Sequence, residues 1–386
     1  MAQVWRRWHR QWHDSVLAGL RSSRSPVDVL ADRKQPALSR VYGWIIDRKR
    51  RRESSHTQRI APPHIPVLSV GNVTFGATGK TPFVQFLIDY VLKQANGAKA
   101  PLLLSRGYGD DEWRMLATQF PACQLAVGRD RVATGAAKVR ELGGEAAPLS
   151  CILLDDGLQQ WRLAKNLEIV MVDALHPLGN GRLLPCGSLR ELPREALARA
   201  DVVVVHHANL LSRDELKALL TNLRTLMDSQ RNQIVATSRM KVVGLIRAVR
   251  LLPGVSSGDS SEVTRKKEEV SLDGRSVLVV CGVGNPESVN KVVEKLARWA
   301  RVEMKAYPDH HAFNSGDVHD ILQWTGELQC DENVVVVTTE KDFARSPSAM
   351  EILADKVDLR VLRCELELQH NSDQVMERID SVLRAM

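Results

Sequence analysis

Short apolar runs rich in β-branched residues alternate with helical patterns from residue 66 onward. The runs are PVLSVG (66–71), PLLLSR (101–106), CILLDD (151–156), EIVMVD (168–173), DVVVVHH (201–207), SVLVVCG (276–282) and NVVVVTT (333–339). Continuous apolar runs of this kind are typical of strands buried on both faces of a parallel sheet. Between them, apolar residues recur at helical spacing, most clearly over 82–94 and 287–300. The pattern predicts an α/β protein with mainly parallel sheets.

The chain is long enough for two such domains, because it has 386 residues. We place the junction near residue 237, which gives a first α/β domain over 61–236 and a second over 237–386. Residues 251–276 are polar and rich in Gly and Ser, a composition that predicts a surface loop in the second domain. Residues 1–60 form a separate, basic and Trp-rich segment.

The N-terminal segment carries the basic character of the chain. Of the 53 Lys and Arg and 46 Asp and Glu residues, 14 basic and 5 acidic residues lie in 1–60, so the remainder has 39 and 41. A near-neutral body argues against nucleic acid as a partner. Trp5, Trp8 and Trp12 recur at helical spacing between arginines, which favours a membrane interface. The Arg-rich, acid-poor start equally favours an organelle-targeting presequence.

A second amphipathic stretch, SRVYGWIIDRKRRR, covers residues 39–52. Trp44 and its apolar neighbours precede a basic cluster that anionic headgroups would attract, although a helix that only packs on the body would have the same pattern.

No run approaches the roughly 20 apolar residues of a membrane-spanning helix. The six cysteines form no C-x-x-C pair, which argues against structural zinc and disulfides and favours a reducing compartment.

Residues 69–83, SVGNVTFGATGKTPF, have the form of a phosphate-binding loop between a strand and a helix. Glycines let backbone N–H groups turn toward phosphate oxygens, a lysine adds charge and the next hydroxyl ligates Mg²⁺. Thr74 stands where the usual pattern has its first glycine. The predicted nucleotide-binding residues are Gly76, Thr78, Gly79, Lys80 and Thr81.

A magnesium site also needs a carboxylate facing the loop, and CILLDDG supplies Asp155 and Asp156 at the end of an apolar strand. We predict that Thr81, Asp155 and Asp156 hold Mg²⁺.

Three further motifs favour a kinase, which must bind a second hydroxyl, over an NTPase that uses water. They are SRGYGDDEW (105–113), GNGRLLPCGSLRE (179–191) and YPDHHAF (307–313). They offer acidic residues, a Gly-rich loop with arginines suited to an anionic or sugar acceptor, and an Asp-His pair. Each also occurs as a turn or a surface hydrogen bond, so a soluble P-loop NTPase or small-metabolite kinase is the alternative.

Taken in order, VGNVTFGATGKTP, SRGYG, LLDDGLQ, VDALHPLGNGRLLPCGSLRE, YPDHHAF and TTEKD resemble the tetraacyldisaccharide 4'-kinase family of the lipid A pathway, from about residue 36 to beyond 345. The resemblance implies transfer of the ATP γ-phosphate to the 4'-hydroxyl of a tetraacyl disaccharide 1-phosphate. It also implies a P-loop NTPase-like first domain, an active site in the cleft between two α/β domains, and a membrane-associated helix near Tyr42 to Ile46.

The resemblance further implies an Asp–His pair, Asp111 with His310, beside Asp309; Asp110 is the alternative if the alignment slips by one. Residues in segments lining the site are Gln159, Arg131, Arg190 and Glu191. Gln160 stands where the family has a histidine. The implied partners are an acylated disaccharide phosphate lipid and a peripheral membrane surface, with no obligate protein partner. The implied location is an inner membrane, mitochondrial in a eukaryote or on the cytoplasmic face in a bacterium.

Overall fold

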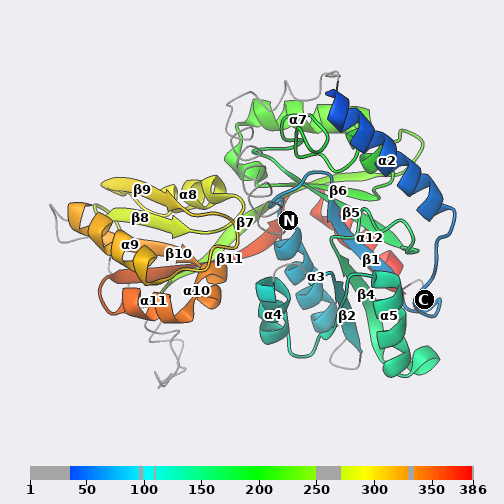
Figure 1. Cartoon of the computed structure of the whole chain (residues 1–386), viewed down its shortest axis with the longest axis horizontal. Helices are drawn as coiled ribbons and strands as arrows, with labels where there is room; N and C mark the ends of the chain where they lie inside the picture. Colours follow the sequence, from blue (N-terminus) through cyan, green and yellow to red (C-terminus); the bar gives the residue numbers. More distant parts are fainter. Residues whose placement is uncertain (1–34, 95–98, 108–109, 249–270, 329–333, 385–386) are drawn as a thin grey trace, which may run out of the picture. The chain divides into compact units, whose positions relative to one another are not determined.

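The computed structural model describes residues 35–94, 99–107, 110–248, 271–328 and 334–384. The chain divides into two compact units (Figure 1). Unit 1 comprises Met1–Arg239 and Leu366–Met386, and unit 2 comprises Met240–Glu365. The amphipathic pattern expected near the start of the chain, and most of the expected loop 251–276, lie outside the described residues.

Unit 1 is built on a parallel sheet with the strand order β3-β2-β4-β1-β5-β6-β7. Its strands are β1 Val67–Asn72, β2 Ala100–Ser105, β3 Gln124–Val127, β4 Leu149–Asp155, β5 Leu167–Asp173, β6 Val202–His206 and β7 Ile234–Arg247. Every residue of β1, β5 and β6 is buried, as continuous apolar strands covered on both faces require. The strand predictions in this unit are therefore confirmed, and the short β3 and the long β7 are additional.

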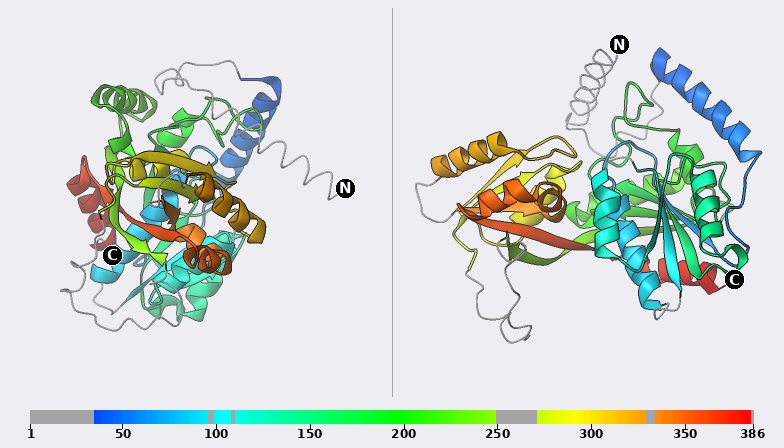
Figure 2. Two further views of the ribbon diagram at one scale, coloured as in Figure 1. Left: turned by 90° about the vertical axis from the view of Figure 1, so that its left-hand side faces the viewer. Right: turned by 60° about the horizontal axis from the view of Figure 1, so that its bottom comes forward.

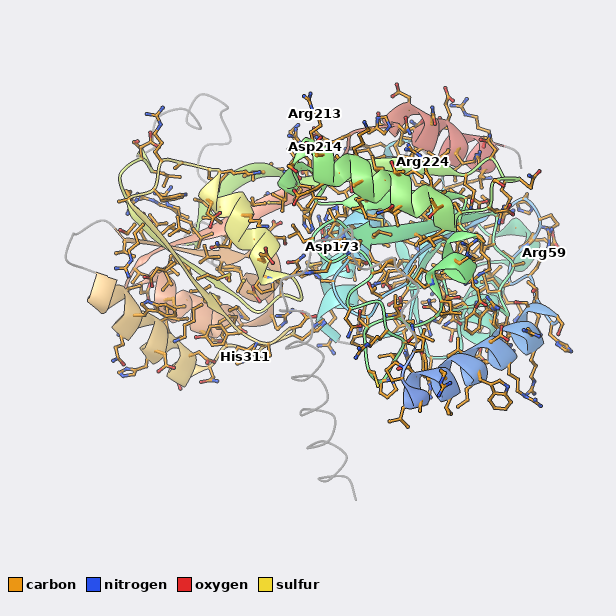
Figure 3. All side chains as sticks on the ribbon, turned by 90° about the horizontal axis from the view of Figure 1, so that it is seen from above. Arg59, Asp173, Arg213, Asp214, Arg224 and His311 are labelled. Carbon is orange, nitrogen blue, oxygen red and sulfur yellow. The ribbon has the colours of Figure 1, made fainter. Side chains whose placement is uncertain are left out.

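Helices cover both faces of this sheet (Figure 2). The helices of this unit are α2 Ala37–Ser54, α3 Lys80–Gln94, α4 Asp110–Gln119, α5 Arg131–Glu141, α6 Pro193–Leu197, α7 Arg213–Leu226 and α12 Ser372–Arg384. One core cluster joins β5 and β6 to Leu219 and Leu223 of α7, and another joins β2 and β4 to Val139 of α5. The start of α7 is set by a capping box between Ser212 and Glu215. Its outer face carries charged residues, including Arg224 (Figure 3).

The last residues of the chain belong to unit 1, whereas the sequence placed all of 237–386 in the second domain. The physical reason is the packing of α12, whose Val375 and Ile379 are fully buried. In addition, the Tyr90 hydroxyl of α3 donates a hydrogen bond to Asp380 Oδ1 at 2.6 Å. An amphipathic terminal helix does not reveal in its own pattern which sheet it covers.

Unit 2 is a smaller parallel sheet with the order β11-β10-β8-β9. Its elements are β8 Ser276–Cys281, α8 Pro286–Glu294, β9 Arg301–Ala306, α9 Ser315–Leu328, β10 Val334–Thr339, α10 Glu340–Arg345, α11 Pro347–Ala354 and β11 Asp358–Leu368. The two strands predicted here, β8 and β10, are confirmed and lie in the middle of the sheet. The helix predicted over 287–300 ends at Glu294.

Both units are thus α/β with parallel sheets, and the predicted fold class is confirmed. Among the described helices, none combines the length and the hydropathy that crossing a membrane would require.

Candidate functional site

The connection from β1 to α3 crosses the carboxyl edge of the unit 1 sheet, which is where open α/β sheets bind ligands. Gly76 and Gly79 adopt φ values of +119° and +87°, in the region that favours glycine. A Cβ added to Gly79 would lie 2.4 Å from Cδ2 of His206, at the end of β6. The loop therefore rests against the β6 end so closely that position 79 accepts glycine alone.

The phosphate-binding loop is also fastened on its other side. The Phe75 N–H donates to the Ser188 carbonyl at 2.6 Å, and Asn72 Nδ2 donates to the Gly76 carbonyl at 3.3 Å. Lys80 and Thr81 then open α3, whose first N–H groups have no partner within the helix. A strand, a constrained glycine loop and the positive end of a helix form the arrangement that binds phosphate.

The two predicted carboxylates, Asp155 and Asp156, lie at the end of the strand next to β1. Asp155 ends β4 and pairs in register with Val70 of β1, two residues before the strand ends at Asn72. Asp156 comes next and holds a φ of +55°, which turns the chain out of the strand. The sheet register thus places the carboxylates next to the phosphate-binding loop.

Asp156 lies among three cations. Burial raises the pKa of Asp156, but the charges of Arg190, Lys80 and Arg131 outweigh burial and lower it to about 2. The Arg190 guanidinium contributes most of this effect and donates from Nη1 to Asp156 Oδ1 at 2.6 Å. The carboxylate is therefore ionised at neutral pH, the form that binds a divalent cation.

The other predicted binding residues lie next to the Arg190–Asp156 pair. Arg190 Nη1 also donates to Gln159 Oε1 at 3.2 Å, and Gln159 Nε2 donates to Glu191 Oε1 at 2.9 Å. Glu191 in turn accepts a hydrogen bond from Arg199 Nη2 at 2.7 Å. Arg131 is buried and couples to Asp156 through its charge. Arg199 was not predicted, because nothing in its local sequence shows that it faces Glu191.

A buried histidine cluster beneath the loop was also missed. His206 Nδ1 lies 2.9 Å from Ser238 Oγ, and burial, followed by the neighbouring His207, lowers the pKa of His206 well below its usual range. His207 Nδ1 lies 2.9 Å from Asp173 Oδ1, in the interior of unit 1 (Figure 3). The run DVVVVHH predicted only a strand. That His206 supports the loop at Gly79 is visible only in the tertiary structure.

The predicted Asp–His pair is divided between the units. Asp111 lies in the first turn of α4 in unit 1, and its side chain is outside the described part of the chain. Asp309 and His310 follow β9 in unit 2, where Asp309 Oδ2 lies 3.8 Å from His310 Nε2 and each side chain is about one third exposed. The partnership of Asp111 with His310 stays a prediction.

Within the described residues, no group of three or more His, Cys, Asp and Glu side chains is arranged to hold a metal. Magnesium at nucleotide sites takes one or two carboxylates and completes its shell with phosphates and water. Thr81, Asp155 and the ionised Asp156 fit that smaller donor set.

Residues 36–384 match the family model described as tetraacyldisaccharide-1-P 4'-kinase. The chain belongs to this family. Relatives include a probable mitochondrial tetraacyldisaccharide 4'-kinase of Arabidopsis thaliana, which is 32% identical over 79% of this chain and 78% of the relative. A tetraacyldisaccharide 4'-kinase of Halothermothrix orenii is 30% identical over 87% of this chain and 89% of the relative.

A solved structure shares the fold of this tetraacyldisaccharide 4'-kinase family member. It is LpxK from Aquifex aeolicus in complex with ATP, with a TM-score of 0.56 and 21% identity over 90% of this chain and 97% of that one. The resemblance drawn from the ordered motifs is confirmed.

We expect Gly79→Ala to weaken nucleotide binding by at least about tenfold, because the added Cβ meets the His206 ring and strains a positive φ. Titration of a fluorescent ATP analogue measures the effect. Gly326→Ala is the matched control, since its Cβ would have no neighbour within 4 Å. Unchanged affinity in Gly79→Ala would contradict the assigned contact.

We expect Asp156→Asn to lower the free energy of unfolding at pH 7 by about 1–2 kcal/mol. The pKa is depressed from 3.8 to about 2, so the stabilisation is complete above pH 4 and disappears as the pH falls toward 2. Urea titrations at pH 7, 4 and 3 should show the difference from wild type shrinking with acidity. Asp89→Asn removes an exposed carboxylate on α3 and should cause no comparable change. A difference that grows toward pH 3 would refute the charge assignment.

Proposed function

We propose that this chain is an ATP-dependent lipid kinase that transfers the γ-phosphate to the 4'-hydroxyl of tetraacyldisaccharide 1-phosphate. Its family and the names of its relatives support the reaction and the acceptor. The observation that carries the proposal is the phosphate-binding loop, held against His206 and lying beside an ionised Asp156. ATP as donor is supported by this loop and by the ATP complex of the solved relative.

In this proposal the first turn of α3 and Lys80 bind the β- and γ-phosphates. The transferred group becomes loose and metaphosphate-like in the transition state, so positioned positive charge lowers the barrier. Magnesium, when bound by Thr81, Asp155 and Asp156, neutralises phosphate charge. The hydrogen bond and charge of Arg190 keep Asp156 ionised and oriented before the nucleotide arrives.

The acceptor hydroxyl needs a group that orients it and takes its proton. We assign this role to Asp111 with His310, supported by the family's motif order. The Asp309 carboxylate lies 3.8 Å from Nε2 of the His310 ring. Arg131, Arg190, Gln159 and Glu191 are proposed to bind the sugar and its phosphate, because they form one charged network beside Asp156.

Helix α2 connects this network to a candidate membrane surface. On one face, the Ser39 hydroxyl donates to the Leu183 carbonyl at 2.7 Å and the Tyr42 hydroxyl donates to the Arg190 carbonyl at 3.0 Å. These contacts fasten α2 to the segment 179–191, along the outside of unit 1 (Figures 1 and 2). The helix is thus part of the folded unit. It is also linked to the site, because the Arg190 that accepts the Tyr42 hydroxyl donates to Asp156.

A second, exposed face of α2 is unusually apolar. Its exposed residues are Leu38, Val41, Trp44 and Ile45, with fractional exposures of 66%, 57%, 63% and 51%. Next to them lies a groove of about 690 Å³ whose lining includes Trp44, Arg48, Lys49, Arg52 and Arg162. An apolar stripe bordered by cations suits the boundary between anionic headgroups and acyl chains. We therefore propose peripheral association of α2 with an inner membrane, which would bring the site to its acylated substrate.

We expect Lys80→Ala to lower transfer of label from γ-labelled ATP to detergent-dispersed tetraacyldisaccharide 1-phosphate on the order of 100-fold or more, since a preorganised charge is lost. Separation of the lipids after incubation with Mg²⁺ measures the transfer. Lys217→Ala, which removes an exposed lysine on α7, is the control for loss of a lysine elsewhere. Near-normal transfer by Lys80→Ala would sink the phosphate-loop assignment, and ATP hydrolysis without lipid label would favour a soluble NTPase.

We expect the double variant Trp44→Gln and Ile45→Gln to bind anionic vesicles several-fold more weakly, because it removes apolar side chains from the exposed face. Sedimentation with phosphatidylglycerol-containing vesicles measures binding, and affinity for ATP should stay unchanged. Ile352→Gln replaces a comparably exposed isoleucine on α11 as the matched control. Equal binding by all three proteins would refute the membrane role of α2.

A further inference from the structure

The loop 307–313 after β9, which carries Asp309 and His310, is held by the end of β8. The Tyr307 N–H donates to the Cys281 carbonyl at 2.8 Å, and the His310 N–H donates to the Gly282 carbonyl at 3.2 Å. His310 itself has a φ of +61°, a strained value for a residue with a side chain. Such a conformation persists only where surrounding contacts enforce it, and the family motif does not show which contacts do so.

Gly282 and the residue after His310 are in turn held by α10, through a fully buried carboxylate, Asp342. The Thr339 hydroxyl donates to Asp342 Oδ2 at 2.7 Å and accepts the Asp342 N–H at 3.2 Å, an N-cap that sets the side chain in place. The backbone N–H of Gly282 and the guanidinium of Arg345, at 3.1 Å, complete the set of donors. Burial raises the pKa of Asp342, and these donors act against it by stabilising the charged form.

Arg345 extends the same network into the loop. Its Nη1 donates to the Gly282 carbonyl at 3.1 Å and to the His311 carbonyl at 3.4 Å, while its side chain is only 8% exposed. One residue later, Ser346 Oγ accepts the Phe313 N–H at 2.9 Å. The end of α10 therefore holds the loop at His311 and Phe313, directly after His310.

The surroundings of Gly282 leave little space for the loop 307–313 to lie elsewhere. A Cβ added to Gly282 would lie 3.0 Å from His311 Cβ, 3.2 Å from the Pro308 carbonyl and 3.3 Å from Asp342 Oδ1. The β8 end, the loop and α10 thus meet at a single glycine. Beyond this point, His311 Nε2 lies 2.9 Å from Asp317 Oδ2, and its ring stacks on Tyr307.

We propose that Asp342 and Arg345 form a clasp that positions the loop carrying Asp309 and His310 for phosphoryl transfer. The inference rests on the proposed function, because His310 acts there on the acceptor. Both clasp residues are positioning residues. Arg345 donates to the backbone carbonyls of His311 and Gly282, and Asp342 holds Arg345 and accepts the Gly282 N–H. A buried ion pair contributes little net stability, since desolvation offsets its attraction, so its effect here is to select one loop conformation.

The test compares Asp342→Asn in the full chain with the same change in a His310→Ala background. If the clasp acts through His310, Asp342→Asn lowers kcat by about tenfold or more in the first case, with KM for ATP unchanged, and has no further effect in the second. Equal fold-losses in both backgrounds would overturn the proposal, as would an unchanged kcat in the single variant.

Asp358→Asn is the matched control, because Asp358 also pairs with an arginine in unit 2. Arg275 Nη1 donates to Asp358 Oδ2 at 2.8 Å, and Asp358 begins β11 at the opposite edge of the sheet from the carboxyl ends of β8 and β10. It should lose stability without the kcat effect. A kcat loss equal to that of Asp342→Asn would mean that unit 2 stability alone is responsible. Arg345→Lys, which keeps the charge but not the planar fork, serves if Asp342→Asn does not fold.

Hydrogen exchange separates failure of the clasp from failure of the proposed function. Asp342→Asn or Arg345→Lys should accelerate exchange of the amides of His310, His311 and Phe313 more than that of the α11 helix, whatever acceptor the enzyme uses. Unchanged exchange in those amides overturns the clasp. If exchange accelerates while the wild-type chain fails to label the lipid, the clasp stands as loop geometry but its link to lipid phosphorylation is overturned together with the proposed acceptor.

Discussion

The hydrogen bond between Arg190 and Asp156 is the interaction on which the arrangement of unit 1 depends. The same arginine donates its backbone N–H to the Val73 carbonyl at 2.9 Å, places its guanidinium 5.4 Å from the Phe75 ring centroid, and accepts the Tyr42 hydroxyl. It therefore joins the carboxylate after β4, the phosphate-binding loop and the exposed helix α2.

This linkage explains how a site rich in charge remains ordered before substrate binds. Asp156 lies among Arg190, Lys80 and Arg131, and their attraction exceeds the cost of burial, so its pKa falls instead of rising. Beneath the loop, His206 is neutral because burial disfavours its charged form, and it supports Gly79 without adding a further cation. Positive charge is thus concentrated around Asp156, beside the loop, and is absent from the His206 ring beneath it.

The two units position their loops at the sheet edge in a similar way. In both, the predicted functional residues lie at the carboxyl ends of parallel strands, and buried side chains of a neighbouring element pack against a glycine: the His206 ring against Gly79 in unit 1, and Asp342 with Arg345 around Gly282 in unit 2. This separation of frame and loop is consistent with a fold shared with Aquifex aeolicus LpxK at 21% identity.

The sequence by itself determined the central strands, the phosphate-binding loop and its adjacent carboxylates, because these depend on residues close together in the chain: continuous apolar runs, glycines before a lysine, and aspartates ending a strand. Only the tertiary structure assigned the C-terminal helix α12 to unit 1, revealed the charged edge strand β9, and brought Arg199, His206 and Asp342 to their partners. Those features are contacts between distant segments. No local pattern encodes them, since a buried polar residue is specified by what the fold places opposite it.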